Sequence, residues 1–395
     1  MSGTGRFEVI CFANDWGGDR LSKKQIMLRL GRRHRILWIN AINNRRPQLA
    51  KKDFGRAWAK LRDFRRGLRQ VDERIWVLAP IYLPFHGHPA LQAINRELLR
   101  RQIRRALRRL GFRAPVTYTF VPTSAQVVGR LGESGIVYHC VDEYAAFSDA
   151  APEVARLEQE LLRKAQLVLT CSAPLQEEKI KYNSNTRLLT HGVDYEHFRR
   201  AAEGSAPPAE ELRALPRPIL GFHGWVADWV DVPLLGELAR LRPDWTLVLV
   251  GRADSDLAPI AGLKNVHVLG MRPYEKLPEY LRGFDVALLP FKMNELTRNA
   301  NPLKLREYLA AGLPVVSAPL PEVLRLREMV AVAATAPEYV QAIEAYLAQG
   351  IRGPSQERSK RMAAESWDAK VAVIEELLTA TFPAAERARA AEAEC

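Results

Sequence analysis

The chain has 395 residues, more than a single hydrophobic core usually serves, so two domains of ordinary size are expected. Hydrophobic residues make up 47% of it, which excludes a disordered chain, and no apolar run approaches the ~20 residues of a membrane-spanning helix. The net charge is +13, yet residues 1–110 hold 26 lysines and arginines against 8 acidic residues, which favours a polyanionic or membrane-surface partner for this part.

Helical and strand-like patterns alternate over the first half of the chain. The expected strands are residues 6–13, 34–40, 74–80, 115–121, 135–142 and 166–172. The expected helices between them are residues 22–33, 95–110 and 152–164. Strands separated by about 10 to 15 helical residues favour a parallel sheet with helices on both faces.

Residues 201–218 interrupt the alternation with a stretch rich in proline, alanine and glutamate, which is typical of a linker. The alternation then restarts with the apolar runs ILGFHG, WTLVLVG, NVHVLG, DVALLP and PVVSAP. The sequence therefore predicts an α/β protein with two domains, 1–200 and 219–380. The last helix of the second domain is a candidate for packing back on the first, and residues 381–395 are expected to form a frayed or disordered tail.

The four cysteines and the N-terminus each support one expectation. Cys11, Cys140 and Cys171 lie in apolar runs, where cysteine is most often a small buried residue, and together with Cys395 they form no CxxC pair. Neither a disulfide nor a zinc site is expected. The N-terminus runs directly into a strand without the pattern of a secretory signal, so we expect a cytoplasmic location.

The stretch NANPLKLREYLAAGLPVV predicts a helix over 302–311 that directly follows a strand, with Asn301 as its N-cap and Gly312 as its end. The start of such a helix presents unpaired N–H groups and the positive end of the helix dipole at the carboxyl ends of parallel strands. Anions bind at such positions.

Two charged residues lie on this expected helix. Lys304 in the first turn opposes the helix dipole, a conflict that a bound diphosphate would remove. Glu307 lies on the same side of the helix and could accept ribose hydroxyl groups. An ordinary surface ion pair between the two residues is the alternative.

The order of motifs in the second half of the chain resembles a known family. LLTHGVDYEHF, NVHVLGMRPYEKLPEYLRGFDVALLPF and NPLKLREYLAAGLPVV together resemble nucleotide-sugar-dependent glycosyltransferases of the GT-B fold. In particular they resemble bacterial cell-surface polysaccharide transferases of the teichuronic-acid type. The resemblance covers about residues 6–378 and is strongest over 264–323. It implies two facing Rossmann-like domains, with the acceptor bound by the N-terminal one and the nucleotide sugar by the C-terminal one.

The resemblance also implies a set of donor-binding residues. Glu307 would bind the ribose, and Lys304 with the N–H groups from Asn301 onward would hold the diphosphate. The other implied donor-binding residues are Gly224 at the phosphate loop, Gly270, Met271 and Arg272 beside the base, and Asn299, Pro302 and Leu303 at the helix start.

Two positions depart from the pattern of the family. Many retaining members carry a glutamate eight positions before the ribose-binding glutamate, whereas this chain has Asn299 there. The segment HGWVADWVD lacks the arginine and the lysine that many members carry after the first strand of the donor domain. Lys304 is expected to supply the missing positive charge, and the sequence leaves both the retaining and the inverting outcome open.

Candidate acceptor-side residues follow two apolar strands of the N-terminal half. Asp142 could deprotonate an acceptor hydroxyl, as an inverting transferase requires, or it could cap a helix. The loop residues Asp15, Trp16, Gly17 and Gly18 border the acceptor in the resembled family, although a plain turn explains the two glycines equally well. The candidates for catalysis are therefore Asp142 and Lys304.

No metal or other cofactor is expected beside the donor substrate. Asp254 and Asp256 are the kind of carboxylates that hold Mg²⁺ on a diphosphate. Two aspartates one residue apart are common in loops, however, and a site with Lys304 and a helix start makes a metal unnecessary.

Residues 51–70 form a second distinctive segment. Eight cations surround an apolar stripe, and the expected membrane-contact residues on it are Phe54, Trp58, Leu61 and Phe64. A basic amphipathic helix of this kind can lie in an anionic membrane surface, and packing against the domain is the alternative. The helix over residues 96–110 is also basic, but its broad apolar stripe predicts that it packs on the core.

The sequence as a whole predicts a glycosyltransferase that moves a sugar from a nucleoside diphosphate sugar to a lipid-linked or polysaccharide acceptor in cell-envelope biosynthesis. Its expected partners are the nucleotide sugar, the acceptor and the anionic inner face of the cell membrane, with peripheral attachment and no nucleic acid. A GT-B nucleotide-sugar epimerase and a basic nucleic-acid-binding protein are the alternatives.

Overall fold

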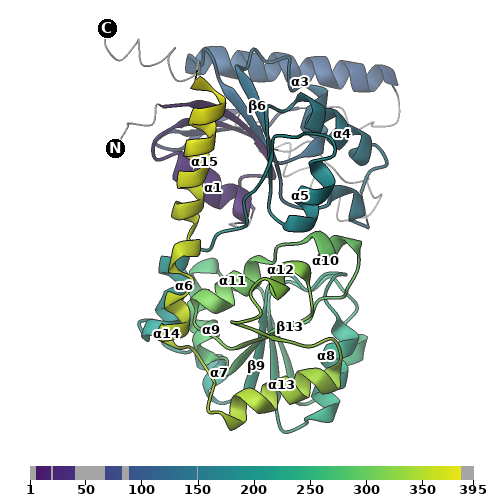
Figure 1. The fold of residues 1–395 in the computed structure, drawn as a ribbon, viewed down its shortest axis with the longest axis vertical. Helices are drawn as coiled ribbons and strands as arrows, with labels where there is room; N and C mark the ends of the chain where they lie inside the picture. The colour runs from purple at the N-terminus through teal and green to yellow at the C-terminus, as the bar shows by residue number, and fades with distance from the viewer. Residues whose placement is uncertain (1–5, 19–20, 41–66, 82–88, 149, 384–395) are drawn as a thin grey trace. The chain divides into compact units, whose positions relative to one another are not determined.

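The computed structural model describes residues 6–18, 21–40, 67–81, 89–148 and 150–383 (Figure 1). The chain forms two compact units. Residues 1–189 and 371–395 form the first unit, and residues 190–370 form the second. The α/β class predicted from the sequence is confirmed, because each unit is built on a largely parallel sheet.

The first unit contains an eight-stranded sheet in the order β3-β4-β2-β1-β5-β6-β7-β8. The strands are β1 Glu8–Ala13, β2 Arg35–Asn40, β3 Leu68–Asp72, β4 Ile75–Leu78, β5 Val116–Thr119, β6 Gly135–Cys140, β7 Leu167–Thr170 and β8 Thr186–Leu188. All pairs are parallel except β3 with β4. The central strands β1, β5, β6 and β7 are buried throughout, which explains their continuous apolar runs.

Helices connect these strands. They are α1 Ser22–Leu30, α3 Pro89–Leu110, α4 Val154–Lys164 and α5 Ala173–Lys179, with the short helices η1 Pro122–Gln126 and η2 Tyr144–Ala146. The predicted core face of α3 is confirmed, since Leu99, Ile103 and Leu107 are at most 5% exposed. The helix begins earlier than expected, at Pro89.

The last helix, α15 (Trp367–Thr381), joins the first unit from Val371 onward. Its Glu375 carboxylate lies 2.9 Å from His34 Nε2 and 3.0 Å from Arg33 Nη1. The backbone N–H of Phe7 donates to His34 Nδ1, so a neutral His34 carries its proton on Nε2 and donates it to Glu375. A buried histidine thus fastens α15 to the start of β2.

The second unit contains six parallel strands in the order β11-β10-β9-β12-β13-β14. The strands are β9 Ile219–His223, β10 Thr246–Val250, β11 Val266–Gly270, β12 Val286–Leu289, β13 Val315–Ser317 and β14 Ala331–Val332. From β9 the chain adds strands first toward one edge of the sheet (β10, β11) and then toward the other (β12, β13, β14), so the strand order reverses between β9 and β12. In open parallel sheets, ligands bind at the carboxyl ends of the strands at such a reversal.

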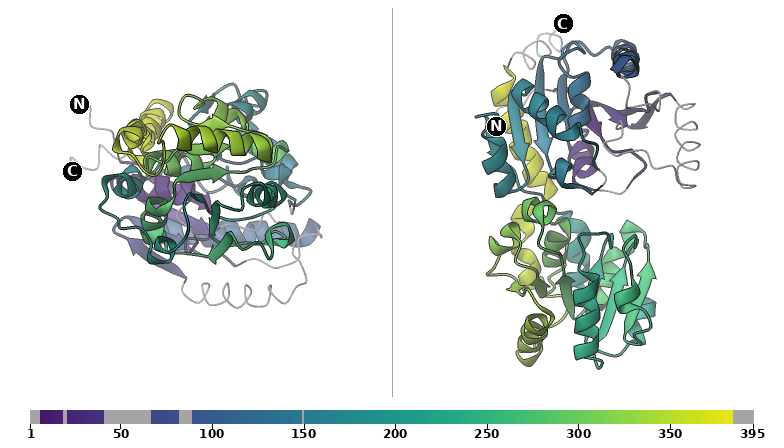
Figure 2. Two further views of the ribbon diagram at one scale, coloured as in Figure 1. Left: turned by 90° about the horizontal axis from the view of Figure 1, so that it is seen from below. Right: turned by 90° about the vertical axis from the view of Figure 1, so that its right-hand side faces the viewer.

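Helices cover both faces of this sheet, as the right-hand view of Figure 2 shows. They are α6 Tyr195–Glu203, α7 Glu210–Arg213, α8 Val232–Leu241, α9 Leu277–Gly283, α10 Glu295–Asn299, α11 Leu303–Ala310, α12 Pro321–Leu324, α13 Ala336–Ala348 and α14 Gln356–Lys360.

The division of the chain differs from the predicted one. Residues 201–218 pack within the second unit and do not form a linker, because Ala201, Ala209 and Leu212 are buried in its core. The units divide after Leu189 and again after Lys370. Within the predicted tail over 381–395, Thr381 still belongs to α15, and the buried Phe382 packs against Gly135.

The basic segment over residues 51–70 is only partly described. Phe54, Trp58, Leu61 and Phe64 lie outside the described residues. Its end was predicted wrongly, because Leu68–Asp72 forms strand β3, which pairs with β4, instead of the end of a helix. No helix in the described part of the chain is long and apolar enough to cross a membrane.

Candidate functional site

The helix α11 starts at the carboxyl edge of the second sheet, where the chain order reverses. Asn294 caps the preceding helix α10 through a reciprocal pair of hydrogen bonds with Thr297. The chain then runs extended through Pro302, and α11 begins at Leu303, one residue later than predicted. Pro302 at its N-cap position makes no side-chain hydrogen bond to the helix, which leaves the first N–H groups of α11 available to a ligand as far as the described residues show.

Asn301 is not the N-cap that the sequence predicted. Its buried side chain accepts a hydrogen bond from Arg306 Nη1 (2.7 Å) and donates one to Glu322 Oε2 (3.3 Å). Its backbone oxygen accepts one from His191 Nδ1 (2.9 Å), and Arg306 Nε donates to the backbone oxygen of His191 (2.7 Å). Asn301 therefore fixes the start of α11 against the segment that leads into α6.

Lys304 lies over the end of β9. Gly224 directly follows β9 with φ +128°, and a Cβ atom at this position would lie 1.9 Å from Lys304 Cε and 2.8 Å from Nζ. Within the described residues, the Lys304 ammonium group has no ion pair and no hydrogen bond. The structure thus brings together Gly224 and Lys304, and it leaves a partly exposed cation at the uncapped start of α11.

Three glycines lie at the carboxyl ends of three neighbouring strands. Gly224, Gly251 and Gly270 end or follow β9, β10 and β11, and all three have positive φ. A Cβ atom at Gly251 would lie 2.0 Å from the backbone oxygen of Gly224, and Gly251 N–H donates to Gly270 O (2.8 Å). These strand ends present backbone instead of side chains, which permits a ligand to approach closely.

Glu307 contacts a buried histidine that the sequence analysis missed. His223, the last residue of β9, is 4% exposed, and its Nε2 lies 3.1 Å from Glu307 Oε2, although the angle is poor for a hydrogen bond. Burial alone would raise the pKa of Glu307. Contact with His223 and the positive potential of Lys304 outweigh burial and lower this pKa below its usual value. Glu307 is therefore an anion at neutral pH.

The backbone of β9 is tied to α11 directly behind this pair. The N–H of His223 donates to the hydroxyl of Tyr308 (2.8 Å), which is buried below α11. The ring of His197 from α6 stacks on the ring of Tyr274, and the two ring centres lie 4.4 Å apart. Burial lowers the pKa of His197. The feature of the sequence that could have pointed to His223 is its position directly before Gly224, at the end of a predicted strand.

The residues predicted to lie beside the base are used in different ways. The guanidinium group of Arg272 is engaged within the protein: it pairs with Glu211 (2.9 Å) and donates to the hydroxyl of Tyr280 (2.6 Å). Met271 is 63% exposed. Asn299 donates to the backbone oxygen of Glu295 within α10 (2.9 Å). Base contact by these residues stays a prediction.

The two aspartates that were considered as metal ligands have partners within the second unit. Asp254 pairs with Arg252 and accepts from Trp225 Nε1 (3.2 Å), and Asp256 accepts from the N–H of Ala258 (2.9 Å). The described residues include no group of three ligands suited to a metal ion. Independence from metal stays a prediction.

In the first unit, Asp142 follows the end of β6. The helical turn η2 has Glu143 at its N-cap position without a side-chain bond, so Asp142 does not cap a helix. Burial raises the pKa of Asp142 to about 6, the nearby charge of Lys23 lowers it, and that of Glu143 raises it. Glu143 itself is paired with the buried Lys179 (2.7 Å), which also pairs with Glu158 (3.0 Å).

The loop after β1 meets the Asp142 region through α1. Lys23 Nζ donates to Asn14 Oδ1 (3.1 Å) and lies 5.3 Å from the ring centre of Tyr144. Lys24 Nζ donates to the backbone oxygens of Trp16 (2.8 Å) and Gly18 (3.3 Å). Asp15 and Gly18 close a tight turn, in which Gly18 N–H donates to Asp15 O (3.0 Å), and a Cβ atom added at Gly17 would meet nothing within 4 Å. Asp142 and this loop thus lie on the same edge of the first sheet.

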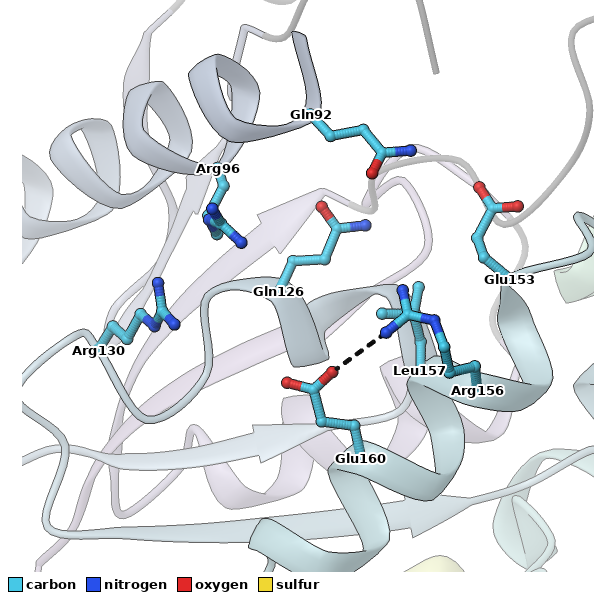
Figure 3. A pocket seen from close by; sticks show the side chains of 8 residues that line it. All are labelled: Gln92, Arg96, Gln126, Arg130, Glu153, Arg156, Leu157 and Glu160. Carbon is cyan, nitrogen blue, oxygen red and sulfur yellow. Dashed lines mark ion pairs between the residues drawn. The ribbon is translucent and has the colours of Figure 1, made fainter. Parts of the chain in front are cut away.

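A separate pocket of about 110 Å³ opens between α3, η1 and α4 of the first unit (Figure 3). Its lining is mostly polar: Gln92, Arg96, Gln126, Arg130, Glu153, Arg156, Leu157 and Glu160. Arg156 and Glu160 form an ion pair at 3.7 Å across one side of it. None of the residues predicted for the donor or acceptor site lines this pocket.

Comparisons with known proteins place the second unit in a family. Residues 217–349 match the profile of the family Glycosyl transferases group 1. The second unit carries a group 1 glycosyltransferase domain. This region runs from before β9 to the end of α13, so Gly224, Lys304 and Glu307 all lie within the group 1 domain.

A curated relative supports the same family. The chain is 29% identical over 235 residues to the putative teichuronic acid biosynthesis glycosyltransferase TuaH of Bacillus subtilis (strain 168). This match covers 55% of the chain and 58% of TuaH, so the chain spans less than two thirds of the length of that relative. The resemblance that the motifs indicated is confirmed.

Solved structures show the fold of the whole chain. Sucrose-phosphate synthase from Thermosynechococcus elongatus superposes with a TM-score of 0.70 at 15% identity, covering 96% of this chain and 100% of that one. HepE of Anabaena in complex with UDP and glucose superposes with a TM-score of 0.64 at 15% identity and the same coverage. The predicted GT-B fold class is confirmed.

Proposed function

We propose that this protein transfers a sugar from a nucleoside diphosphate sugar to an acceptor in cell-envelope polysaccharide biosynthesis, and that the donor binds at the start of α11. The observation that carries this proposal is the unpaired ammonium group of Lys304, which lies over Gly224 at an uncapped helix start, one turn from the anionic Glu307.

The diphosphate of the donor fits the positive side of this site. Lys304 opposes the dipole of its own helix, so a ligand with two phosphates would satisfy both the ammonium group and the free N–H groups of α11. The same groups would stabilise the charge that develops on the departing nucleoside diphosphate. They would supply this charge without a metal ion.

The ribose and the base fit the neighbouring positions. The Glu307 side chain is 18% exposed and has two acceptor oxygens, of which Oε2 contacts His223, so it can accept a hydrogen bond from a ribose hydroxyl. The end of β11 at Gly270 and the exposed Met271 provide an open, apolar surface for a base. Uridine is the first candidate, because the fold relative HepE was solved with UDP.

Asp142 supports an inverting mechanism. Its pKa of about 6 leaves the carboxylate ionised at pH 7, yet makes it a stronger base than an exposed aspartate. We propose that it removes the proton from the acceptor hydroxyl. The likeness to TuaH and the basic N-terminal part together favour a lipid-linked or polysaccharide acceptor at an anionic membrane.

The donor site is tested by thermal unfolding with UDP, GDP, ADP and dTDP and their common sugar conjugates, each with and without EDTA. One series is expected to raise the midpoint of the wild type by about 5 °C at 100 times its dissociation constant, and EDTA is expected to change nothing. Glu307→Gln is expected to lose this rise. Glu295→Gln, which changes an exposed carboxylate on α10, serves as the matched control and should keep it. Loss of the rise in both variants, or in neither, would contradict the role of Glu307.

A further inference from the structure

The long helix α3 has two opposite faces. At about 100° per residue, the buried side chains Leu99, Ile103, Ala106 and Leu107 lie on one face. The opposite face is exposed and carries the α3 arginine face, which consists of Arg101, Arg104, Arg105, Arg108 and Arg109. Figure 1 shows α3 as one continuous helix along the margin of the first unit. Its 22 residues correspond to about 33 Å.

Within the described part of the protein, four of the five arginines of the α3 arginine face have no acidic partner. Glu97 is the single acidic residue of α3. Its carboxylate is taken by Arg100, which donates two hydrogen bonds (2.7 and 2.8 Å), and by Arg101 (2.6 Å). The side chains of Arg104, Arg105, Arg108 and Arg109 form no ion pair or hydrogen bond with any described residue.

The spacing of these arginines is unfavourable for the helix itself. Like charges three or four residues apart destabilise a helix, and Arg101, Arg104, Arg105 and Arg108 form several such pairs. Arg108 and Arg109 lie in the last turn, where a cation stabilises the helix dipole, but the other three arginines lie too far from the helix end to benefit. An anionic partner would remove the repulsion.

We propose that the α3 arginine face docks the protein on an anionic lipid bilayer. This inference rests on the proposed function, because it supplies the route by which the enzyme would reach a lipid-linked acceptor. Charge complementarity is its first support, since anionic headgroups attract basic side chains held near the surface. Ile94 is its second support: it is 52% exposed and lies within about 40° of the centre of this face, where it can enter the boundary of the acyl chains.

A membrane fits this face better than a nucleic acid. Helix α3 contains no phenylalanine, tyrosine or tryptophan on which an unpaired base could stack. The arginines occupy one side of a straight helix over about 12 Å, and Ile94 extends that line by about 10 Å, so a broad flat surface can contact all of them together. Arg96 lies about 150° around α3 from the centre of this face and lines the pocket in Figure 3, so it is not part of this face.

The test compares two variants of equal charge in the full-length protein. The first changes Arg104, Arg105, Arg108 and Arg109 to glutamine, which keeps the helix propensity high. The matched control changes Lys264, Arg352, Lys360 and Arg361, four exposed cations of the second unit, to glutamine. Binding is measured by sedimentation with vesicles of 30% phosphatidylglycerol in phosphatidylcholine and with vesicles of phosphatidylcholine alone. Circular dichroism checks that both variants fold.

We expect the wild type and the control to bind the anionic vesicles and not the neutral ones. The α3 variant should bind about 600-fold more weakly, because each of the four basic residues that it loses contributes about a fivefold factor near an anionic surface. Equal loss in both variants would show that only the net charge matters and would overturn the proposal. Equal binding of the wild type to neutral vesicles would overturn it as well.

A binding experiment with nucleic acid tests the alternative partner of the α3 arginine face. Duplex DNA is offered to the same variants and as a competitor for vesicle binding. If the wild type binds DNA as tightly as the anionic vesicles, and the α3 variant loses both equally, the face is a general polyanion site and the proposal is wrong. The thermal response to UDP is measured in parallel. It should be unchanged in the α3 variant, so failure of membrane docking and failure of the donor site give different results.

Discussion

The substitution Gly224→Ala adds a single Cβ atom to the candidate donor site. The added Cβ atom would lie 1.9 Å from Lys304 Cε, far inside van der Waals contact. Because Cε belongs to the end of a flexible side chain, Lys304 can move aside, and its ammonium group then leaves the strand end. The φ of +128° at this position is also unfavourable for alanine. The substitution therefore changes both the stability of the second unit and its affinity for a diphosphate.

The two effects have separate magnitudes. Forcing alanine into a positive-φ conformation of this kind is expected to lower the free energy of unfolding by about 1–3 kcal/mol. Loss of the contact between the Lys304 ammonium group and a phosphate corresponds to a charged hydrogen bond, about 1.5–3 kcal/mol. The dissociation constant for the preferred nucleoside diphosphate should therefore rise by about 10- to 150-fold.

Calorimetric titration with the nucleotide and urea denaturation measure these two quantities on the same protein. Gly262→Ala is the matched control, because Gly262 has φ +75° and nothing lies within 4 Å of its added Cβ atom. It should cost stability and leave the affinity unchanged. Lys304→Met should show the reverse. In the double variant of Gly224 and Lys304, the two losses of affinity should not add, because both remove one interaction.

Normal nucleotide affinity in Gly224→Ala would refute this reasoning, since Lys304 would then either keep its position despite the added atom or take no part in binding. Normal affinity in Lys304→Met would decide between these explanations in favour of the second. The diphosphate would then be held by the N–H groups of α11 alone.

Two further predictions concern the first unit. Burial raises the pKa of Asp142 to about 6 from its ordinary 3.8, so its contribution to stability falls as the pH rises through this range. Asp142→Asn should be more stable than the wild type at pH 7, by up to about 3 kcal/mol, and equal to it near pH 3.5 in urea denaturation; an equal gain at both would contradict the shift. Glu375→Ala should lower the free energy of unfolding by about 3 kcal/mol, because it leaves His34 buried without an acceptor, whereas Glu375→Gln, which keeps one, should lose clearly less.

The strands and the helix that carry the donor site were predictable from local sequence. β9, β10 and β12 are short apolar runs, and α11 lies between Pro302 and Gly312, which restrict where a helix begins and ends. The conflict between Lys304 and the helix dipole was also visible in the sequence. These features depend on residues close together in the chain.

Features that depend on distant partners were not predictable. Leu68–Asp72 became a strand because it pairs with β4, although its basic and apolar spacing continued a helical pattern. Residues 201–218 have the composition of a linker, yet a few apolar side chains in them pack against the second core. The contact of His223 with Glu307 joins residues 84 positions apart, and no local pattern announces it.

Lys304 and the α3 arginine face share one physical property. Lys304 opposes the dipole of its own helix, and the arginines repel one another along α3. Neither Lys304 nor Arg104, Arg105, Arg108 and Arg109 forms an ion pair with a described residue. They differ in what surrounds them. Lys304 is half-buried beside glycines and one carboxylate, so it suits a small ligand with a few phosphates and a ribose. The arginines are exposed along a straight helix, so they suit an extended surface. The proposed function calls for both kinds of site, one for a nucleotide sugar from solution and one for the membrane that would hold a lipid-linked acceptor.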